Sequence, residues 1–358
     1  MVVERKVLLD ALKLAMPGIE SGSVMLQGSD SFVFHDGKLF TYNDSIAVLV
    51  PIESTGLIDQ NVEGVVKAKE FFNVISKFSS DEISFEVKDS KSWVLKCGKA
   101  KVEMALLDLD YSKRLEGVAP NGDWEDLPDG FSDALASCRM VGNKSDLAGV
   151  YVRDNYVIST DGLQINMFTF KEKLPSFWIS DNSLAELLKL SSIKRVEVGK
   201  SWVHFEAEDG VVFSVKMLND EKFPYENIVN LMKNSKPSEN DLRGTFPKEL
   251  FPAVDRADNF AFDMLDRPVV RLTLSSEGIE VSAEKSSGKY VENISWESDA
   301  PQIEDSVVVY VNAVMMLSMS QHSLDFYLLK GKNKKGNVVP RLLFVSESST
   351  HLMSTFSV

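Results

Sequence analysis

The sequence has few of the features that mark secreted or membrane proteins. Its 358 residues include two cysteines, Cys97 and Cys138, in different parts of the chain, which argues against a disulfide framework and favours a reducing compartment. No apolar run approaches the roughly 20 residues that cross a membrane. The first helical stretch contains Glu4 and Asp10, whereas a signal peptide has an apolar core. We therefore expect a cytoplasmic protein with no membrane partner.

Positive charge is also in deficit. The chain has 39 Lys and Arg against 53 Asp and Glu, a net charge of −14. This balance argues against a protein that binds nucleic acid over its whole surface, because phosphate contacts need Lys and Arg. It leaves room for a protein that gathers its basic residues on one face and covers the rest with acids.

Signals of catalysis are nearly absent. The four histidines are scattered without metal-ligand spacing, and the chain has no Cys-x-x-Cys pair, phosphate-binding glycine loop or nucleophile elbow. Asp108 and Asp110 form one D-x-D pair that could hold a metal, although two solvated carboxylates at a strand end are the favoured explanation. We predict no catalytic residue, no metal site and no cofactor; a metal enzyme that uses these aspartates is a distant alternative.

What the chain does have is a threefold internal repeat. Each copy contains an amphipathic helix, strands, a second amphipathic helix and more strands, and such repetition indicates that the copies build a common surface. The first helices are expected at Arg5 to Met16, Phe131 to Val141 and Lys248 to Phe260, and the second helices at Lys67 to Phe78, Ser180 to Leu190 and Val311 to Gln321.

The segments between the helices alternate apolar and polar residues, as strands with one buried face do. Turns are expected at residues 35–38, 153–155 and 275–278. Helices on one side of antiparallel sheets make an α+β fold. Polar stretches at 115–128 and 233–241 suggest three domains, at 1–123, 124–236 and 237–358.

Short motifs in this order resemble the DNA sliding clamp, the beta subunit of bacterial or bacteriophage DNA polymerase III. The middle repeat is the most similar, with Leu147-Ala148-Gly149-Val150, then Ser159-Thr160-Asp161-Gly162, then Phe223-Pro224. In the third repeat, Leu250 to Ala257 resembles the family's A-R-A helix. The resemblance spans the chain and implies a clamp fold whose three repeats carry two inner helices each and close as a ring.

Two departures fall in the family's partner-binding region. The family's His-Arg after T-D-G is replaced by Leu163-Gln164, and its C-terminal M-P-M-R-L is replaced by residues 354–358, STFSV. These departures favour a divergent clamp, such as one from a phage. Pro252 lies inside a predicted helix, where it should kink the helix or delay its start.

In the family the helices face a central hole that holds duplex DNA, contacted without sequence preference. Basic residues on or near the predicted helices are the candidates for that contact, although ordinary solvated helix faces explain them too. A ring retains DNA by topology, so weak and salt-sensitive contacts are enough. The candidates are Arg5, Lys6, Lys13, Lys69, Lys77, Arg139, Lys189, Lys194, Arg195, Lys248 and Arg256.

The resemblance also implies a pocket between the second and third repeats that receives short peptides from the polymerase and the clamp loader. Leu147, Ile165 and Leu352 have a plainer explanation as core residues of strands. The matching positions are Leu147, Thr160, Gly162, Leu163, Ile165, Pro224, Leu352 and Phe356.

A ring requires a head-to-tail contact between two different patches of the same chain. The family pairs an edge strand of the first domain with the third domain of a neighbour. Val102 and Met104 are the strand candidates, and Asn259 and Phe260 lie at the facing helix end. Lys330 to Lys335 forms a basic hairpin tip, either a solvated turn or a contact to DNA or the loader.

Together these observations predict a non-enzymatic sliding clamp, a homodimeric ring that tethers the replicative polymerase to duplex DNA. The main alternative is a clamp-like processivity factor that acts as a monomer or an unusual oligomer.

Overall fold

The computed structural model describes residues 1–20, 27–57, 62–89, 91–140, 145–190, 192–264, 267–297, 300–319, 324–332 and 338–356. Its contacts group into two compact units. Unit 1 comprises Met1–Ala136 and Leu174–Asn219, and unit 2 comprises Ser137–Lys173 and Asp220–Val358. The division into three domains stays a prediction.

Unit 1 is built on an eight-stranded antiparallel sheet. Strand β4 of the first repeat pairs with β14 of the second, with Val48 opposite Phe213, so one sheet joins the two repeats. In sheet order the strands are β5 (Gly64–Lys67), β2 (Ser31–His35), β3 (Lys38–Tyr42), β4 (Ile46–Pro51), β14 (Val212–Lys216), β13 (Trp202–Ala207), β12 (Ile193–Val198) and β9 (Glu125–Asp126).

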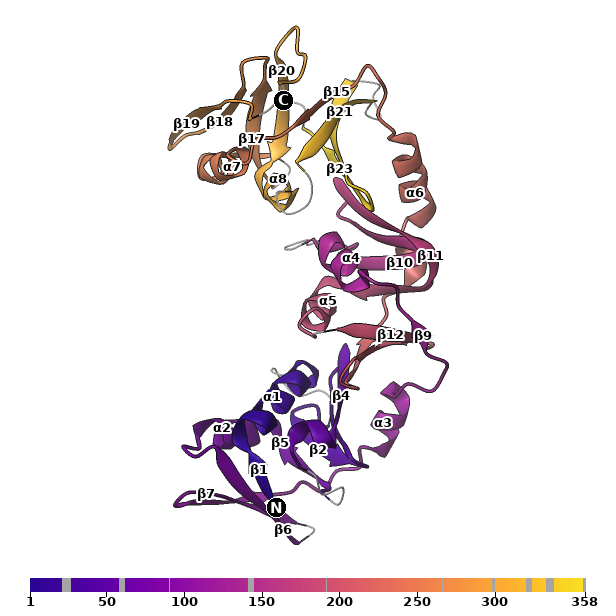
Figure 1. The fold of residues 1–358 in the computed structure, drawn as a ribbon, viewed down its shortest axis with the longest axis vertical. Helices are drawn as coiled ribbons and strands as arrows, with labels where there is room; N and C mark the ends of the chain where they lie inside the picture. The colour runs from indigo at the N-terminus through magenta and orange to yellow at the C-terminus, as the bar shows by residue number, and fades with distance from the viewer. Residues whose placement is uncertain are drawn as a thin grey trace. The chain divides into compact units, whose positions relative to one another are not determined.

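Helices α1 (Arg5–Ala15) and α2 (Ala68–Lys77) pack together beside these strands (Figure 1). Leu8, Leu12 and Ala15 recur at helical spacing and are buried, which fixes the face that α1 turns to the core. A shorter helix, α3 (Ser112–Val118), supplies Leu115 and Val118 to a cluster on the first-repeat strands. The other helical segments of unit 1 are η1 (Met16–Gly18), η2 (Ile52–Thr55), α5 (Asp181–Leu187) and most of α4 (Phe131–Cys138).

A four-stranded sheet completes unit 1. Its order is β1 (Val2–Glu4), β6 (Glu82–Asp89), β7 (Ser92–Cys97) and β8 (Ala100–Ala105). Trp93 is fully buried at the centre, with its ring 5.1 Å from the rings of both Phe34 and Phe85 and 6.0 Å from that of Phe71. Edge-to-face packing of this kind adds to the energy of burial.

Unit 2 also contains two sheets. In the first, β11 of the middle repeat pairs with β23 at the end of the third, which joins these two repeats. Its order is β10 (Gly149–Thr160), β11 (Gln164–Ser180), β23 (Ser349–Ser354), β22 (Val338–Val345), β21 (Asp325–Lys332) and β15 (Leu242–Thr245). The second has β16 (Phe262–Met264), β17 (Arg267–Leu274), β18 (Ile279–Lys285) and β19 (Gly288–Ile294), and β20 (Val307–Asn312) also pairs with β17.

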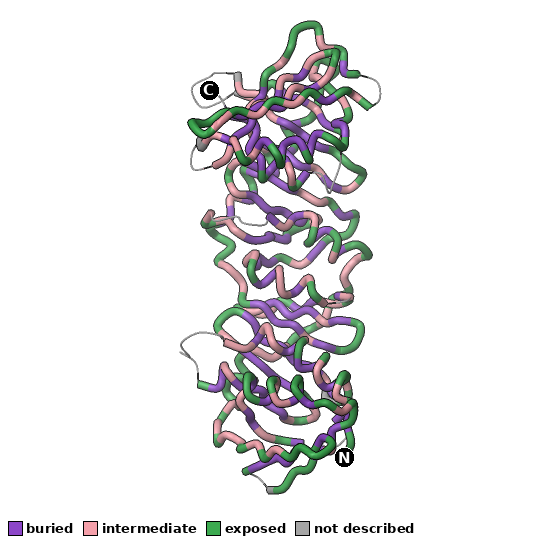
Figure 2. The backbone as a smooth tube through the Cα atoms, turned by 90° about the vertical axis from the view of Figure 1, so that its left-hand side faces the viewer, coloured by how far each residue is buried: buried purple, intermediate pink, exposed green. Residues whose placement is uncertain are grey.

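Helices α7 (Leu250–Asp258) and α8 (Ala313–Met319) pack together on the third-repeat core. Pro252 is the third residue of α7, in the first turn, where a missing backbone N–H breaks no helical bond, so the proline is accommodated by a late helix start. In Figure 2 the buried stretches run through the strands and packed helix faces of each unit, and the turns are exposed. The remaining helical segments of unit 2 are η3 (Asp220–Lys222) and α6 (Tyr225–Asn234).

The expected α+β layout and the six repeat helices are confirmed. The turn at Asp36 and Gly37 is confirmed too, with φ of 47° and 66°, as is the one between β17 and β18, where Ser275 N donates to Gly278 O. The expected hairpin turn at residues 153–155 is wrong. Strand β10 continues through it, and only Asp154, with φ of 55°, departs from extended geometry.

Cys97 and Cys138 are both buried and unbridged. Burial raises the pKa of the Cys138 thiol to about 12, so it stays protonated at neutral pH. Within the described ranges, no helix combines the length and apolar character needed to span a membrane.

Candidate functional site

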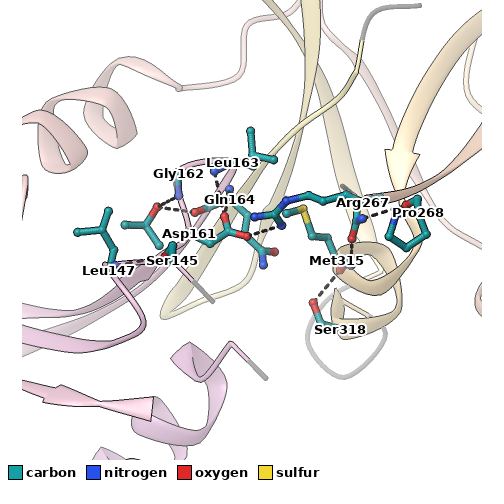
Figure 3. A network of polar contacts seen from close by, with 12 residues as sticks. Ser145, Leu147, Asp161, Gly162, Leu163, Gln164, Arg267, Pro268, Met315 and Ser318 are labelled. Carbon is teal, nitrogen blue, oxygen red and sulfur yellow. Dashed lines mark hydrogen bonds and ion pairs between the residues drawn. The ribbon is translucent and has the colours of Figure 1, made fainter. Parts of the chain in front are cut away.

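The T-D-G turn between β10 and β11 is held by its own side chains. Asp161 Oδ1 accepts the backbone N–H groups of Leu163 and Gln164, each at 2.9 Å. Thr160 Oγ1 accepts Gly162 N at 3.1 Å and donates to Gln164 O at 2.7 Å. Gly162 has φ of +88°, a conformation that suits glycine. Residues 160–164, called the pocket loop below, therefore have a fixed shape (Figure 3).

The third repeat holds this loop from the other side. Arg267, at the start of β17, donates from Nη1 to Asp161 Oδ2 at 2.8 Å, and the Asp161 side chain is only 3% exposed. The next residue, Pro268, accepts Asn312 Nδ2 at 2.9 Å. Asn312 Oδ1 in turn accepts Met315 N at 2.9 Å and caps α8. A chain of polar contacts thus runs from the pocket loop to α8 within unit 2 (Figure 3).

The apolar pocket candidates differ in accessibility. Ile165 and Leu352 lie opposite each other in the β11–β23 ladder and are buried. Thr160 and Phe356 are buried as well, and Phe356 N donates to Tyr310 O at 2.8 Å. A ligand at the surface could therefore reach Leu163, which is half-buried, before it reaches any of these four.

Leu147 and Pro224 are likewise half-buried. Pro224 lines a cavity of about 360 Å³ together with residues of β10 and the start of α6. In its wall the Arg153 guanidinium lies 4.7 Å from the Tyr225 ring centre, and Tyr225 Oη donates to Asp154 at 2.7 Å. Burial, and then this bond to Asp154, raise the pKa of the Tyr225 hydroxyl. This part of the wall is therefore an uncharged aromatic ring that is held by Asp154 and covered by the Arg153 guanidinium.

Three of the DNA candidates are exposed lysines on the packed helix pair of unit 1. Lys6 lies on α1, and Lys69 and Lys77 lie on α2. In the described part of the chain none of the three forms an ion pair, so each is available to a phosphate. Lys248, just before α7 in unit 2, is exposed as well.

Other candidates are already occupied by acids. Lys13 contacts Asp10 at 2.8 Å and Lys189 contacts Glu186 at 2.6 Å, each within one helical turn. Such pairing lowers the positive potential offered to DNA. The other paired candidates are Arg5 with Asp81 at 3.9 Å, Lys194 with Glu208 at 4.0 Å, Arg195 with Glu206, and Arg256 with Glu292 at 2.8 Å.

Position in the fold separates the candidates further. Lys194 and Arg195 lie on strand β12 and not on a helix, and Arg195 lies 5.5 Å from the ring centre of Trp124. Arg139 follows the end of α4 and is half-buried. Lys189 follows α5. The role of these residues in DNA contact stays a prediction.

In each unit, the candidate residues for the subunit contact lie on or beside a strand at the edge of a sheet. In unit 1 the edge is β8, where Val102 and Met104 are half-buried between exposed neighbours. In unit 2 the edge is β19. Beside it, Phe260 stacks on Tyr290 with ring centres 6.4 Å apart, and Asn259 is the exposed C-cap of α7. Unpaired edges of this kind offer backbone groups to another strand.

The one D-x-D pair has a structural use. Asp110 Oδ1 accepts Ser112 N at 3.1 Å and Ser112 Oγ at 2.5 Å, which orders the start of α3. Across the described ranges, no cluster of three or more His, Cys, Asp or Glu could hold a metal. The tip of the basic hairpin, from residue 333, lies outside the described residues.

Sequence reasoning missed a buried carboxylate at the junction of the first two repeats. Glu197 on β12 is 3% exposed, and its Oε1 accepts the N–H groups of Asn121 and Gly122 at 2.9 and 2.6 Å. His204 lies opposite it on β13, and its Nδ1 is 2.7 Å from Ser214 Oγ. Burial lowers the pKa of His204, and Glu197 offsets part of that shift. Arg267 and Asn312 were missed as well, because no local pattern marks them.

The whole architecture matches solved structures of sliding clamps. A beta clamp of Helicobacter pylori bound to a DNA ligase peptide is 18% identical with a TM-score of 0.76, and the match covers 100% of this chain and 99% of that one. The beta subunit of Streptococcus pyogenes DNA polymerase is 17% identical with a TM-score of 0.78 over 100% and 99%. The DNA polymerase III beta subunit of Pseudomonas aeruginosa is 14% identical with a TM-score of 0.77 over 100% of both chains.

No profile of a known protein family matches the sequence, and a search of curated proteins finds no match. The matches to solved structures nevertheless show that the chain has the DNA-clamp fold. Within that class, its structure follows the beta subunit of bacterial DNA polymerase III from end to end, and the resemblance seen in the sequence is confirmed for the fold.

Proposed function

We propose that this protein is a DNA sliding clamp, a non-enzymatic processivity factor that encircles duplex DNA and tethers a replicative polymerase. The observation that carries the proposal is the match to clamp structures over the full length of both chains, with every repeat included. A protein that had kept one clamp module for another purpose would match over one part alone. We place its action in the cytoplasm of a bacterium or of a phage-infected cell.

The proposed assembly is a homodimeric ring. Strand β8 of one protomer would pair with β19 of the other, so that Val102 and Met104 meet the Phe260 side of the neighbour. Both edges are unpaired in the described chain, and joining them would satisfy their backbone groups and protect them from aggregation. Light scattering should then give about twice 39.9 kDa, and a mass of one chain at micromolar concentration would contradict the ring.

Encirclement has its own test. Clamp loaded on nicked circular DNA should remain bound through gel filtration in high salt, because topology and not charge retains it. Cutting the circle once should release it. Equal retention before and after the cut would refute encirclement and would favour a processivity factor that does not close around DNA.

For the partner site, we propose that short peptides of the polymerase and clamp loader bind at the pocket loop beside Leu147, Leu163 and Pro224. These residues combine partial exposure with the conformational order of the loop. The H. pylori clamp with its bound DNA ligase peptide supplies a suitable probe class.

Leu163→Asp should weaken the binding of a labelled DNA ligase peptide at least tenfold. Burial of one leucine side chain against a ligand contributes about 1.5–3 kcal/mol, and tenfold corresponds to about 1.4 kcal/mol. Fluorescence anisotropy measures the affinity. Val308→Asp, at a partly exposed valine of β20 in the same unit, is the matched control and should bind normally. Unchanged affinity in Leu163→Asp, with the ring intact, would refute this pocket.

A further inference from the structure

We infer that Arg267 is a positioning residue of the partner pocket, which sets the shape of the pocket loop through Asp161. The inference rests on the proposed pocket function and extends it to a residue 106 positions away in the sequence. Figure 3 shows the Arg267 side chain extending from the start of β17 to the turn that carries Leu163.

Asp161 divides its two oxygens between two tasks. Oδ1 holds the N–H groups of Leu163 and Gln164, and Oδ2 receives Arg267 Nη1. Among the described residues, Arg267 alone forms an ion pair with this carboxylate. The Asp161 side chain is 3% exposed, so its negative charge is almost removed from water.

An isolated buried carboxylate is unfavourable, and its usual response is to turn toward water or take up a proton. Removal of Arg267 would leave Asp161 in that state. Because the same carboxylate holds the loop from Oδ1, either response releases the N–H groups of Leu163 and Gln164. The loop would then sample several conformations in place of one.

Two other hydrogen bonds to the loop do not depend on Asp161, and they limit the region that would become mobile. Ser354 N donates to Leu163 O at 2.8 Å, and Thr160 Oγ1 still holds Gln164 O. The strands on both sides therefore remain paired, and the disorder should be confined to residues 160–164. A peptide that binds Leu163 would have to order the loop again, which lowers affinity without removing any direct contact.

The test combines hydrogen exchange on the free protein with peptide binding. In Arg267→Gln, the amides of Leu163 and Gln164 should exchange at least tenfold faster than in the wild type, whereas those of β22 and β23 should not change. A labelled DNA ligase peptide should bind at least fivefold more weakly. Arg267→Lys keeps a cation beside Asp161 and should restore affinity to within about twofold.

Two controls separate positioning from general destabilisation. Arg243→Gln removes an exposed arginine from β15 of the same unit and should leave exchange and affinity unchanged. Val281→Ala weakens the buried core of the third repeat, against which Leu163 packs, and leaves the Asp161–Arg267 ion pair in place, so it should lower stability but not affinity.

The outcomes are distinct. Unchanged exchange at Leu163 and Gln164 in Arg267→Gln would overturn the positioning role. Equal loss of affinity in Val281→Ala would overturn it as well, because the effect would then be one of stability. Absence of peptide binding by the wild type would count against the proposed pocket, and the exchange measurement would still decide whether Arg267 orders the loop.

Discussion

Replacing Glu197 with alanine should loosen the segment that joins the first and second repeats. In the structure one oxygen of this buried carboxylate holds two consecutive backbone N–H groups, those of Asn121 and Gly122. No other side chain in the described part of the chain makes a hydrogen bond to either of these two N–H groups. The segment should therefore lose its attachment to β12 when the carboxylate is removed.

The expected magnitude follows from the two bonds and their surroundings. A hydrogen bond to a charged group contributes about 1.5–3 kcal/mol, so the pair could contribute about 3–6 kcal/mol. Asn121 and Gly122 are exposed, however, and water can replace the lost acceptor. We expect Glu197→Ala to lower the free energy of unfolding of unit 1 by about 2 kcal/mol. Glu197→Gln keeps an acceptor without the charge and should lose about 1 kcal/mol or less.

Urea unfolding followed by tryptophan fluorescence measures this loss, because four of the five tryptophans belong to unit 1. Hydrogen exchange at Asn121 and Gly122 localises it. The reasoning fails if Glu197→Ala unfolds at the wild-type urea concentration, or if exchange at both amides is unchanged. A loss as large in the glutamine variant as in the alanine variant would show that charge, and not the acceptor position, holds the segment.

Two further predictions concern charge. Asp10→Asn and Glu186→Gln free Lys13 and Lys189 from their helical ion pairs; each change should raise affinity for duplex DNA severalfold at low salt and steepen the salt dependence by about one phosphate contact, as measured by anisotropy against KCl concentration. An unchanged slope would place both lysines away from DNA. Burial lowers the pKa of His204, so neutral His204 stabilises the fold above the unfolded value near 6.5, and stability is lost as pH falls below it toward the folded pKa. His204→Gln should flatten the stability profile as pH falls below about 6.5, and a profile parallel to the wild type would contradict this assignment.

The six repeat helices could be predicted because each carries a strong apolar stripe. For α1, Leu8 and Leu12 recur one turn apart and are buried as the period requires. The short helix α3 was missed because its sequence, SKRLEGV, has only two large apolar residues, Leu115 and Val118, which pack on strands distant in the sequence. Helix α6 was missed although it has a full apolar stripe, with Tyr225, Ile228 and Val229 buried at helical spacing.

The false turn at residues 153–155 has a physical reason. Asp-Asn is a turn signal because both residues tolerate positive φ. Here Asp154 alone adopts it, and its carboxylate accepts the Tyr225 hydroxyl from 71 residues away. Long-range contact therefore decides the local conformation, which a window of neighbouring residues does not reveal.

The parts of the site that depend on a local sequence motif could be predicted, whereas the parts that depend on ion pairs between distant residues could not. The T-D-G turn was found because Asp161 and Gly162 act on their own neighbours. Arg267 was not, since its importance comes from a contact across 106 positions. The pairing of Lys13 with Asp10 lies within reach of a helical spacing rule, and it lowers the basic character that the residue list alone suggested.

The two cysteines have a practical consequence. Both thiols are buried, and that of Cys138 stays protonated far above neutral pH. Maleimide reagents attack accessible thiolates, so the native fold offers them little background. A single cysteine engineered at an exposed position would then carry a dye selectively, and the motion of individual proteins along a stretched duplex could be filmed without first removing the natural cysteines.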